Sequence, residues 1–184
     1  MKHPIALAFA IALSGSMAAC TDAGSGKNES ATSQAQTDKV ATDAGNPFFS
    51  ESPLPLHYPQ FDKIKDSDFA PGFDRGMAEQ LKEVQAIAGN AEAPTFDNTI
   101  IALEQSGQIL NRTSTVFFSL VGVDTNDARK ALQAEYAPKL AAHRDAISLD
   151  PQLFARIQQL YDTRDSLGLD AEGVRLIERY HTDF

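Results

Sequence analysis

The fold class is decided by residues 94–121, PTFDNTIIALEQSGQILNRTSTVFFSLV. Apolar and small residues recur there at alternating spacings of four and three: Phe96, Ile100, Leu103, Gly107, Leu110, Ser114, Phe117 and Val121. This spacing places all of them on one face of an α-helix. Thr95 follows a proline and is a helix start signal, because its hydroxyl can accept a hydrogen bond from a free amide of the first turn. The stretch therefore predicts a helix of about seven turns, in which the small Gly107 and Ser114 let a neighbouring helix approach closely, and which residues 122–125 end.

The segment before this stretch carries the same helical period. It begins near Ser67 or Asp68, and Pro71 falls in its opening turn, where the missing amide hydrogen of proline costs little. Gly89 and Asn90 follow the last apolar residue and form an end signal. The residues that share its apolar face are Phe69, Phe73, Met77, Leu81, Val84 and Ala88.

A third helix is predicted to start at Thr125 or Asn126. The residues on its less polar side are Ala128, Leu132, Tyr136, Leu140, His143 and Ile147. Pro138 lies inside this segment. Because proline lacks an amide hydrogen and its ring collides with the preceding turn, we expect a kink or a break there.

Two more helices follow, each with a capping aspartate. Asp150 and Pro151 start the fourth, and Gly168 closes it. Its shared face carries Leu153, Ile157, Leu160, Arg164 and Leu167. Asp170 caps the fifth helix. No strand pattern competes with these periods, so we predict an all-α protein of about five amphipathic helices.

The fifth helix runs to the last residue without an end signal. Its stripe consists of Val174, Ile177, His181 and Phe184. Natural helices tend to close with glycine or asparagine, or with a basic residue in the last turn. We therefore expect that the sequence stops inside a helix of a longer protein and that its apolar faces are made to pack against further polypeptide.

The first twenty residues carry the features of an export signal. Lys2 and His3 precede the apolar run 5–13, which is too short to span a bilayer as a helix. The run ends in SGSMAAC, which resembles a bacterial lipoprotein cleavage box with methionine where leucine is usual. We predict a signal peptide over residues 1–19 and lipid attachment at Cys20. The alternative is ordinary cleavage near residue 19 that leaves Cys20 as a free thiol.

Two segments of different character join this signal to the helices. Residues 20–46 hold one large aliphatic residue, Val40, and read as a disordered tether. The threonine after Cys20 resembles lipoproteins sent to the outer membrane, which predicts a periplasmic protein with a membrane anchor. The next segment, NPFFSESPLPLHYPQFDKI (46–64), is rich in proline and aromatic residues. We predict an extended arm that lies across the helices.

The sequence shows no recognisable catalytic site. Its four histidines are His3, His57, His143 and His181, and no two are spaced as zinc ligands on one helix. His143 and His181 fall on apolar stripes and are interpreted as half-buried structural residues. No nucleophile elbow or phosphate-binding loop is present. The net charge of −9 disfavours nucleic-acid binding. We predict no catalytic, cofactor-binding or metal-ligating residue in this chain.

Residues 46–112 and 126–181 nevertheless resemble a known family, the thimet-oligopeptidase-like zinc metallopeptidases. They are most similar to the N-terminal region of the bacterial peptidyl-dipeptidases, also called dipeptidyl carboxypeptidases. The resemblance rests on FDKIK (61–65), Asp68 and Phe69 with Pro71, PTFDNT (94–99), APKL (137–140) and RYH (179–181). Gly72 stands where alanine is expected.

The resemblance implies a large helical enzyme of two lobes around a channel that admits short peptides. It places zinc and its H-E-x-x-H helix in the C-terminal part, which has no counterpart here. Residues 47–184 would be the incomplete N-terminal helical portion that caps the channel, with the missing catalytic portion as its partner. We therefore expect this chain to be inactive alone. The alternative is a small helical lipoprotein that acts as a binding or adaptor module.

Overall fold

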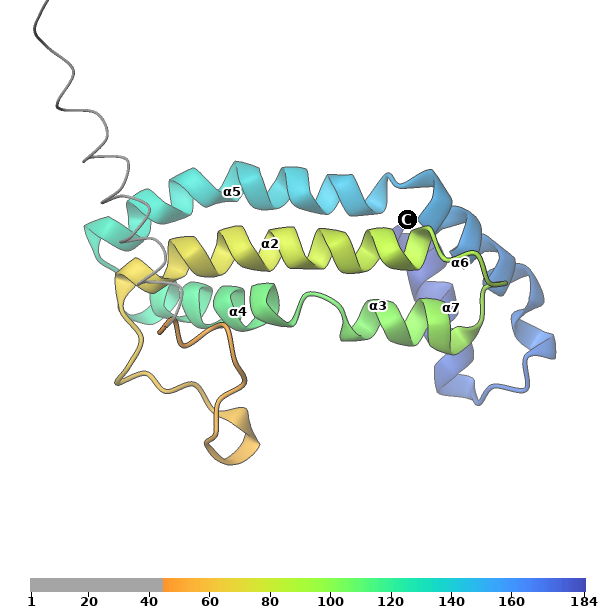
Figure 1. Cartoon of the computed structure of the whole chain (residues 1–184), viewed down its shortest axis with the longest axis horizontal. Helices are drawn as coiled ribbons and strands as arrows, with labels where there is room; N and C mark the ends of the chain where they lie inside the picture. Colours follow the sequence, from red (N-terminus) through yellow and green to blue (C-terminus); the bar gives the residue numbers. More distant parts are fainter. Residues whose placement is uncertain (1–44) are drawn as a thin grey trace, which may run out of the picture. The chain divides into compact units, whose positions relative to one another are not determined.

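The computed structural model of the protein describes residues 45–184 (Figure 1). The predicted signal peptide, Cys20 and nearly all of the predicted tether lie outside these residues. The helical elements are, in chain order, η1 (Pro55–His57), α2 (Asp66–Ala88), η2 (Phe96–Ile101), α3 (Ala102–Gln105), α4 (Gln108–Val123), α5 (Asp127–Ser148), α6 (Pro151–Thr163), η3 (Arg164–Ser166) and α7 (Ala171–Asp183). No strand occurs among the described residues, so the predicted all-α class is confirmed. None of the helices within residues 45–184 combines the length and the apolar character needed to cross a membrane.

Helix α2 packs against α4 so closely that there is no room for a side chain at two of its glycines. A Cβ atom added at Gly76 would lie 2.7 Å from the Cα and N atoms of Leu110 on α4. At Gly72 it would lie 2.8 Å from the hydroxyl oxygen of Thr113. The small residues that allow this approach therefore include two glycines of α2. Helix α2 also begins at Asp66, slightly before the predicted start, so that Pro71 lies at its sixth position.

The prediction of one long helix from residue 95 to residue 121 is wrong in one respect. The helix is broken at Ser106 and Gly107. Its start is as predicted: Thr95 is the N-cap, its hydroxyl accepts from the Asn98 amide at 3.0 Å, and the Asn98 side chain accepts from the Thr95 amide at 2.8 Å. The first six residues form a π-helical turn, η2. Gly107 then adopts a left-handed backbone conformation with φ of +71°, and its amide donates to the Glu83 carboxylate at 2.7 Å. A glycine takes this conformation without the steric cost that other residues meet.

Helix α5 is not broken at Pro138, contrary to one of the two predicted outcomes there. It runs from Asp127 to Ser148 as one helix. The carbonyl that loses its hydrogen bond to the proline belongs to Ala134, and both residues are exposed. Water can therefore satisfy this carbonyl, which lowers the cost of a proline inside the helix.

Tyr136 anchors α5 on α2. Its ring stacks on Phe73 with centroids 4.9 Å apart, and its hydroxyl donates to the Asp74 carboxylate at 2.9 Å. Burial, reinforced by Asp74, raises the pKa of Tyr136. The hydroxyl thus remains a hydrogen-bond donor throughout the neutral range.

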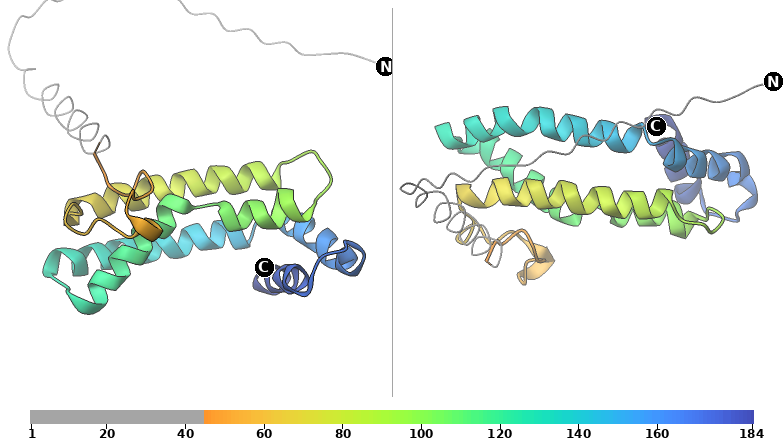
Figure 2. Two further views of the ribbon diagram at one scale, coloured as in Figure 1. Left: turned by 90° about the horizontal axis from the view of Figure 1, so that it is seen from below. Right: turned by 45° about the horizontal axis from the view of Figure 1, so that its top comes forward.

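The described residues form two hydrophobic cores. The first joins the end of α2 to η2, α3, α6 and α7, and its fully buried members include Ile100, Leu153, Ile157 and Ile177. The second joins the start of α2 to α4 and α5 around Phe69, Phe73 and Phe117. The two further views show α6 and α7 near the end of α2 and the arm near its start (Figure 2). Helices α2 and α5 contribute to both cores.

The start of the proline-rich arm attaches to the helices, as predicted. Asn46 is buried and donates to the Asp68 carbonyl at 2.8 Å. Phe48 is buried against Phe69, and its carbonyl accepts from Arg112 at 3.1 and 3.2 Å. Figure 1 shows that the rest of the arm loops away from the helices.

The prediction that the whole arm lies across the helices is therefore wrong for residues 54–61, whereas Ile64 at its end packs against the second core. The exposed apolar side chains there are Leu54, Leu56, Tyr58 and Phe61. Leu56 and His57 take left-handed backbone conformations with φ of 56° and 55°. This tight turn directs Leu56 outward, where it is 97% exposed.

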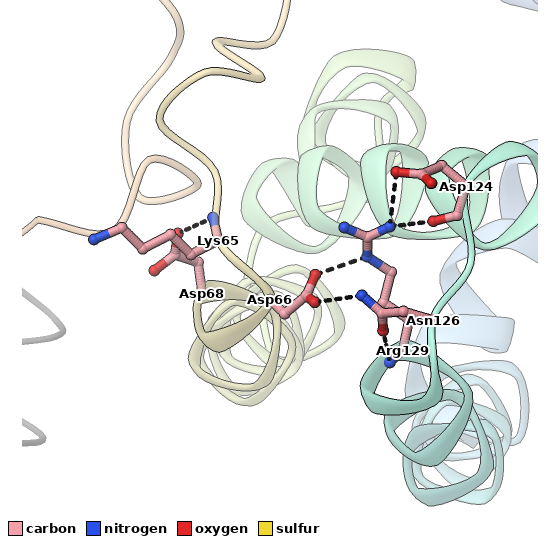
Figure 3. A network of polar contacts seen from close by, with 6 residues as sticks. All are labelled: Lys65, Asp66, Asp68, Asp124, Asn126 and Arg129. Carbon is pink, nitrogen blue, oxygen red and sulfur yellow. Dashed lines mark hydrogen bonds and ion pairs between the residues drawn. The ribbon is translucent and has the colours of Figure 1, made fainter.

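A polar network ties the start of α2 to the start of α5 (Figure 3). The Asp66 carboxylate accepts from the side-chain nitrogen of Asn126 and from the Arg129 guanidinium, each at 2.7 Å. Arg129 also donates to the carbonyl of Asp124. The hydrogen bond from Asn126, with that from Arg129, lowers the pKa of Asp66. The network fixes the turn that reverses the chain between α4 and α5.

Candidate interaction groove

A groove of about 680 Å³ lies between helices α2, α4, α5 and α7. The residues that line it are Gln80, Val84, Leu103, Ser106, Leu110, Ser114, Phe118, Ala137, Leu140, Ala141, His143, Arg144, Ile147, Ser148, Tyr180 and Phe184. Most of these side chains are apolar or small. We call this feature the α4–α5 groove and treat it as the candidate site, because apolar grooves of this size commonly receive another molecule or segment.

The α4–α5 groove exposes residues that the helical pattern assigns to buried faces. Leu110, Leu140 and Ile147 lie on the predicted stripes, yet they are only partly buried. Phe118 remains 43% exposed. The apolar faces of these helices are therefore not fully covered by the described part of the chain.

The charged side chain of the groove lining is that of Arg144, which is basic. Arg144 and His143 both lie in the lining, which contains no aspartate or glutamate. Arg144 is exposed and makes no ion pair with the described residues. In a protein with a net charge of −9, the groove lining thus carries the positive side chain of Arg144 and no acidic side chain.

His143 is half-buried at the edge of this groove, as its place on the stripe indicates. Its Nε2 lies 2.8 Å from the side-chain oxygen of Gln80, so the neutral tautomer with hydrogen on Nε2 donates to that oxygen. Burial lowers the pKa of His143 below its ordinary value. The folded protein therefore favours neutral His143.

The lowered pKa of His143 predicts a loss of stability in mild acid. The unfolded chain takes up the proton near pH 6.5, whereas the folded chain resists it, so this stability is present above pH 6.5 and is lost as pH falls through the lower folded pKa. We expect that the wild type loses more stability than the His143→Gln variant between pH 7.5 and about 5. Urea unfolding at both pH values measures this. Equal losses would show that His143 does not titrate differently in the two states.

The other described histidines lie elsewhere. His57 is on the exposed arm, with Nδ1 3.1 Å from the Ser52 carbonyl oxygen. The His181 ring stacks on Tyr161 at 3.8 Å, and its Nε2 lies 2.9 Å from the side-chain oxygen of Gln158. Residues 45–184 contain no group of three histidine, cysteine, aspartate or glutamate residues that could hold a metal ion.

Sequence reasoning missed Arg156, the buried guanidinium of α6. It is 7% exposed, and one terminal nitrogen donates to the carbonyls of Asn90 and Glu92 at 2.8 and 2.9 Å. The other terminal nitrogen donates to the Asn98 side chain at 2.9 Å. Its Nε has no partner in the described part of the chain. Its spacing of three positions after Leu153 and four before Leu160, which places it on the buried face of α6, was the available signal.

Residues 45–184 thus form an all-α protein that carries the α4–α5 groove and contains no metal-holding group within this range. No family model matches the sequence. Dipeptidyl carboxypeptidase of Escherichia coli (strain K12) is 43% identical over 139 residues, which make up 76% of this chain. The enzyme of the same name from Salmonella typhimurium is 42% identical over the same length.

By this identity the chain is a homologue of the dipeptidyl carboxypeptidases, and the predicted resemblance to the peptidyl-dipeptidases is confirmed. The aligned region amounts to 20% of the length of each of these relatives. The chain therefore corresponds to about a fifth of the proteins that it resembles.

Proposed function

We propose that this chain is the N-terminal helical portion of an exported zinc peptidase that removes dipeptides from the C-terminal end of short peptides. The observation that carries the proposal is the identity of 43% over 139 residues with a dipeptidyl carboxypeptidase five times longer than the aligned region. In this proposal the helices form part of the wall of a channel that admits only short peptides. The chemistry is supplied by the remaining polypeptide.

The residues of the described chain do not fit the zinc ion that such an enzyme uses. Catalytic zinc needs three protein ligands that converge on one point. Residues 45–184 contain no group of this kind. We therefore assign no step of catalysis to this chain and propose that both the metal and the base that activates water belong to the rest of the enzyme.

We further propose that the protein is exported as a lipoprotein, with Cys20 as the lipid attachment site and a periplasmic membrane anchor. The support is the order of basic, apolar and small residues before Cys20. Treatment of cells with labelled fatty acid should mark the wild-type chain and leave a Cys20→Ser variant unlabelled. Labelling of both chains would exclude Cys20 as the attachment site.

The peptidase proposal is tested with a chimera. The segment of the E. coli dipeptidyl carboxypeptidase that aligns with this chain is replaced by the aligned residues of this chain. We expect the chimera to release C-terminal dipeptides from a short peptide and to lose this activity when zinc is removed. The 184-residue chain alone should release none.

Two results would contradict the proposal. One is a folded chimera, with the circular dichroism and zinc content of its parent, that releases no dipeptides. The other is zinc-dependent release of dipeptides by the isolated 184-residue chain. The parent enzyme, assayed beside both proteins, is the positive control.

A further inference from the structure

We infer that the α4–α5 groove is the docking site for one amphipathic helix of the catalytic portion, with an apolar ridge and an acidic side chain that faces Arg144. The inference rests on the proposed function, because that function requires further polypeptide as a partner. It names the surface of this chain that the partner contacts and the chemistry that the surface selects.

The composition of the groove suits a helix with an apolar ridge. Leu110, Leu140, Ile147 and Phe118 supply apolar surface that the described chain leaves partly accessible. Burial of such surface is the main favourable term in association. An occupant that covers these four side chains gains this term without any rearrangement of the cores.

Small residues on both walls allow a helix backbone to come close. Ala137 and Ala141 lie four positions apart on α5, and therefore on one face of that helix, and both are exposed. Ser106 and Ser114 line the wall formed by α3 and α4. In helix-in-groove recognition an amphipathic helix lays its apolar face into a hydrophobic groove, and these small side chains leave room for its backbone.

The charge of the groove lining determines which sign of charge on the occupant is favoured. Because Arg144 is the charged side chain of the lining and neither aspartate nor glutamate accompanies it there, an acidic group on the occupant is attracted. A second copy of this chain would instead bring a second Arg144 toward the first in a two-fold symmetric contact. Like charges then oppose each other, so the charges favour the catalytic portion over self-association.

The test compares one substitution in two settings. Ala141→Glu places a bulky acidic side chain in the groove, whereas Ala142→Glu places the same side chain on the next position of α5, which is exposed and does not line the groove. In the isolated 184-residue chain the groove is empty in this proposal, so both variants should unfold at the wild-type temperature within about 2 °C. In the chimera the groove is filled, so Ala141→Glu alone should lower the melting temperature by several degrees.

Each outcome decides the inference. The inference is supported if Ala141→Glu lowers the melting temperature of the chimera but not that of the isolated chain. Equal effects of Ala141→Glu and Ala142→Glu on the melting temperature of the chimera overturn it. If Ala141→Glu instead dissociates a dimer of the isolated chain in size-exclusion chromatography, the occupant is a second copy and the inference fails. If the unsubstituted chimera folds and lacks activity, the proposed function fails, while the comparison of melting temperatures still decides the docking site. If the unsubstituted chimera does not fold, both the proposed function and the docking site fail.

Discussion

Gly76→Ala is expected to destabilise the protein by about 3 kcal/mol, although alanine is normally the better helix former. The added methyl group would lie 2.7 Å from backbone atoms of Leu110, which cannot rotate away as a side chain can. Helices α2 and α4 would have to separate, and the aromatic contacts between Phe69, Phe73 and Phe117 would loosen. Urea unfolding followed by circular dichroism measures the change in free energy.

Gly122→Ala is the matched control for Gly76→Ala. Gly122 is also helical, near the end of α4, and a Cβ atom there would meet nothing within 4 Å. Without a collision, the lower backbone entropy of alanine in the unfolded chain should raise the stability by about 0.5 kcal/mol. The two substitutions thus act in opposite directions. A stabilising Gly76→Ala would show that α2 and α4 are not in close contact at this point.

Arg156→Met is expected to cost about 3 kcal/mol. The substitution keeps an unbranched apolar stem but removes the hydrogen bonds to the carbonyls of Asn90 and Glu92 and to the Asn98 side chain. These acceptors would lose their partner, and the segment between α2 and η2 would lose its tie to α6. Urea unfolding measures the loss, and faster proteolysis near residues 90–95 should accompany it.

Arg179→Met is the control for the loss of an arginine. Arg179 is 60% exposed, and its ion pair with Glu104 at 2.8 Å lies in solvent. Water and salt screen such pairs, so the expected change is less than about 1 kcal/mol. Equal effects of the two substitutions would mean that the buried position of Arg156 adds nothing to stability. That result would require the cost of burying its charge to cancel its hydrogen bonds.

The starts of η2, α6 and α7 were predictable from the sequence because local chemistry determines them. The Asp150 carboxylate accepts from the amides of Gln152 and Leu153 at 2.8 and 3.0 Å, and that of Asp170 accepts from the Gly173 amide at 2.8 Å. Capping depends on residues two or three positions apart, which a sequence displays directly. The same holds for the apolar stripes, whose members include the buried Ile157 and Ile177.

The break at Gly107 was not predictable from the period. The apolar spacing continues across it, because both helical pieces keep a face toward α2. What distinguishes this glycine is the contact of its amide with Glu83, twenty-four positions earlier in the chain. The exposed half of the arm was missed for a similar reason, since apolar composition does not reveal whether a partner surface is present.

The candidate groove was foreseen only as a general expectation that apolar faces remain open. Its place between α2, α4, α5 and α7 depends on how these helices pack against one another, which the sequence does not display. The lack of acidic side chains in its lining also appears only after folding, because His143 and Arg144 become neighbours of residues more than thirty positions away. The resemblance to peptidyl-dipeptidases was available from short motifs such as PTFDNT.

Two cores that share only α2 and α5 need not open to solvent together. A local unfolding that releases α6 and α7 can leave the Phe69, Phe73 and Phe117 cluster intact, and the reverse opening can spare Leu153 and Ile157. Amide protons in the middle of α2 are released by neither event alone. They should be the slowest to exchange with deuterium, and this central segment would mark the part of the molecule whose protection reports its global stability.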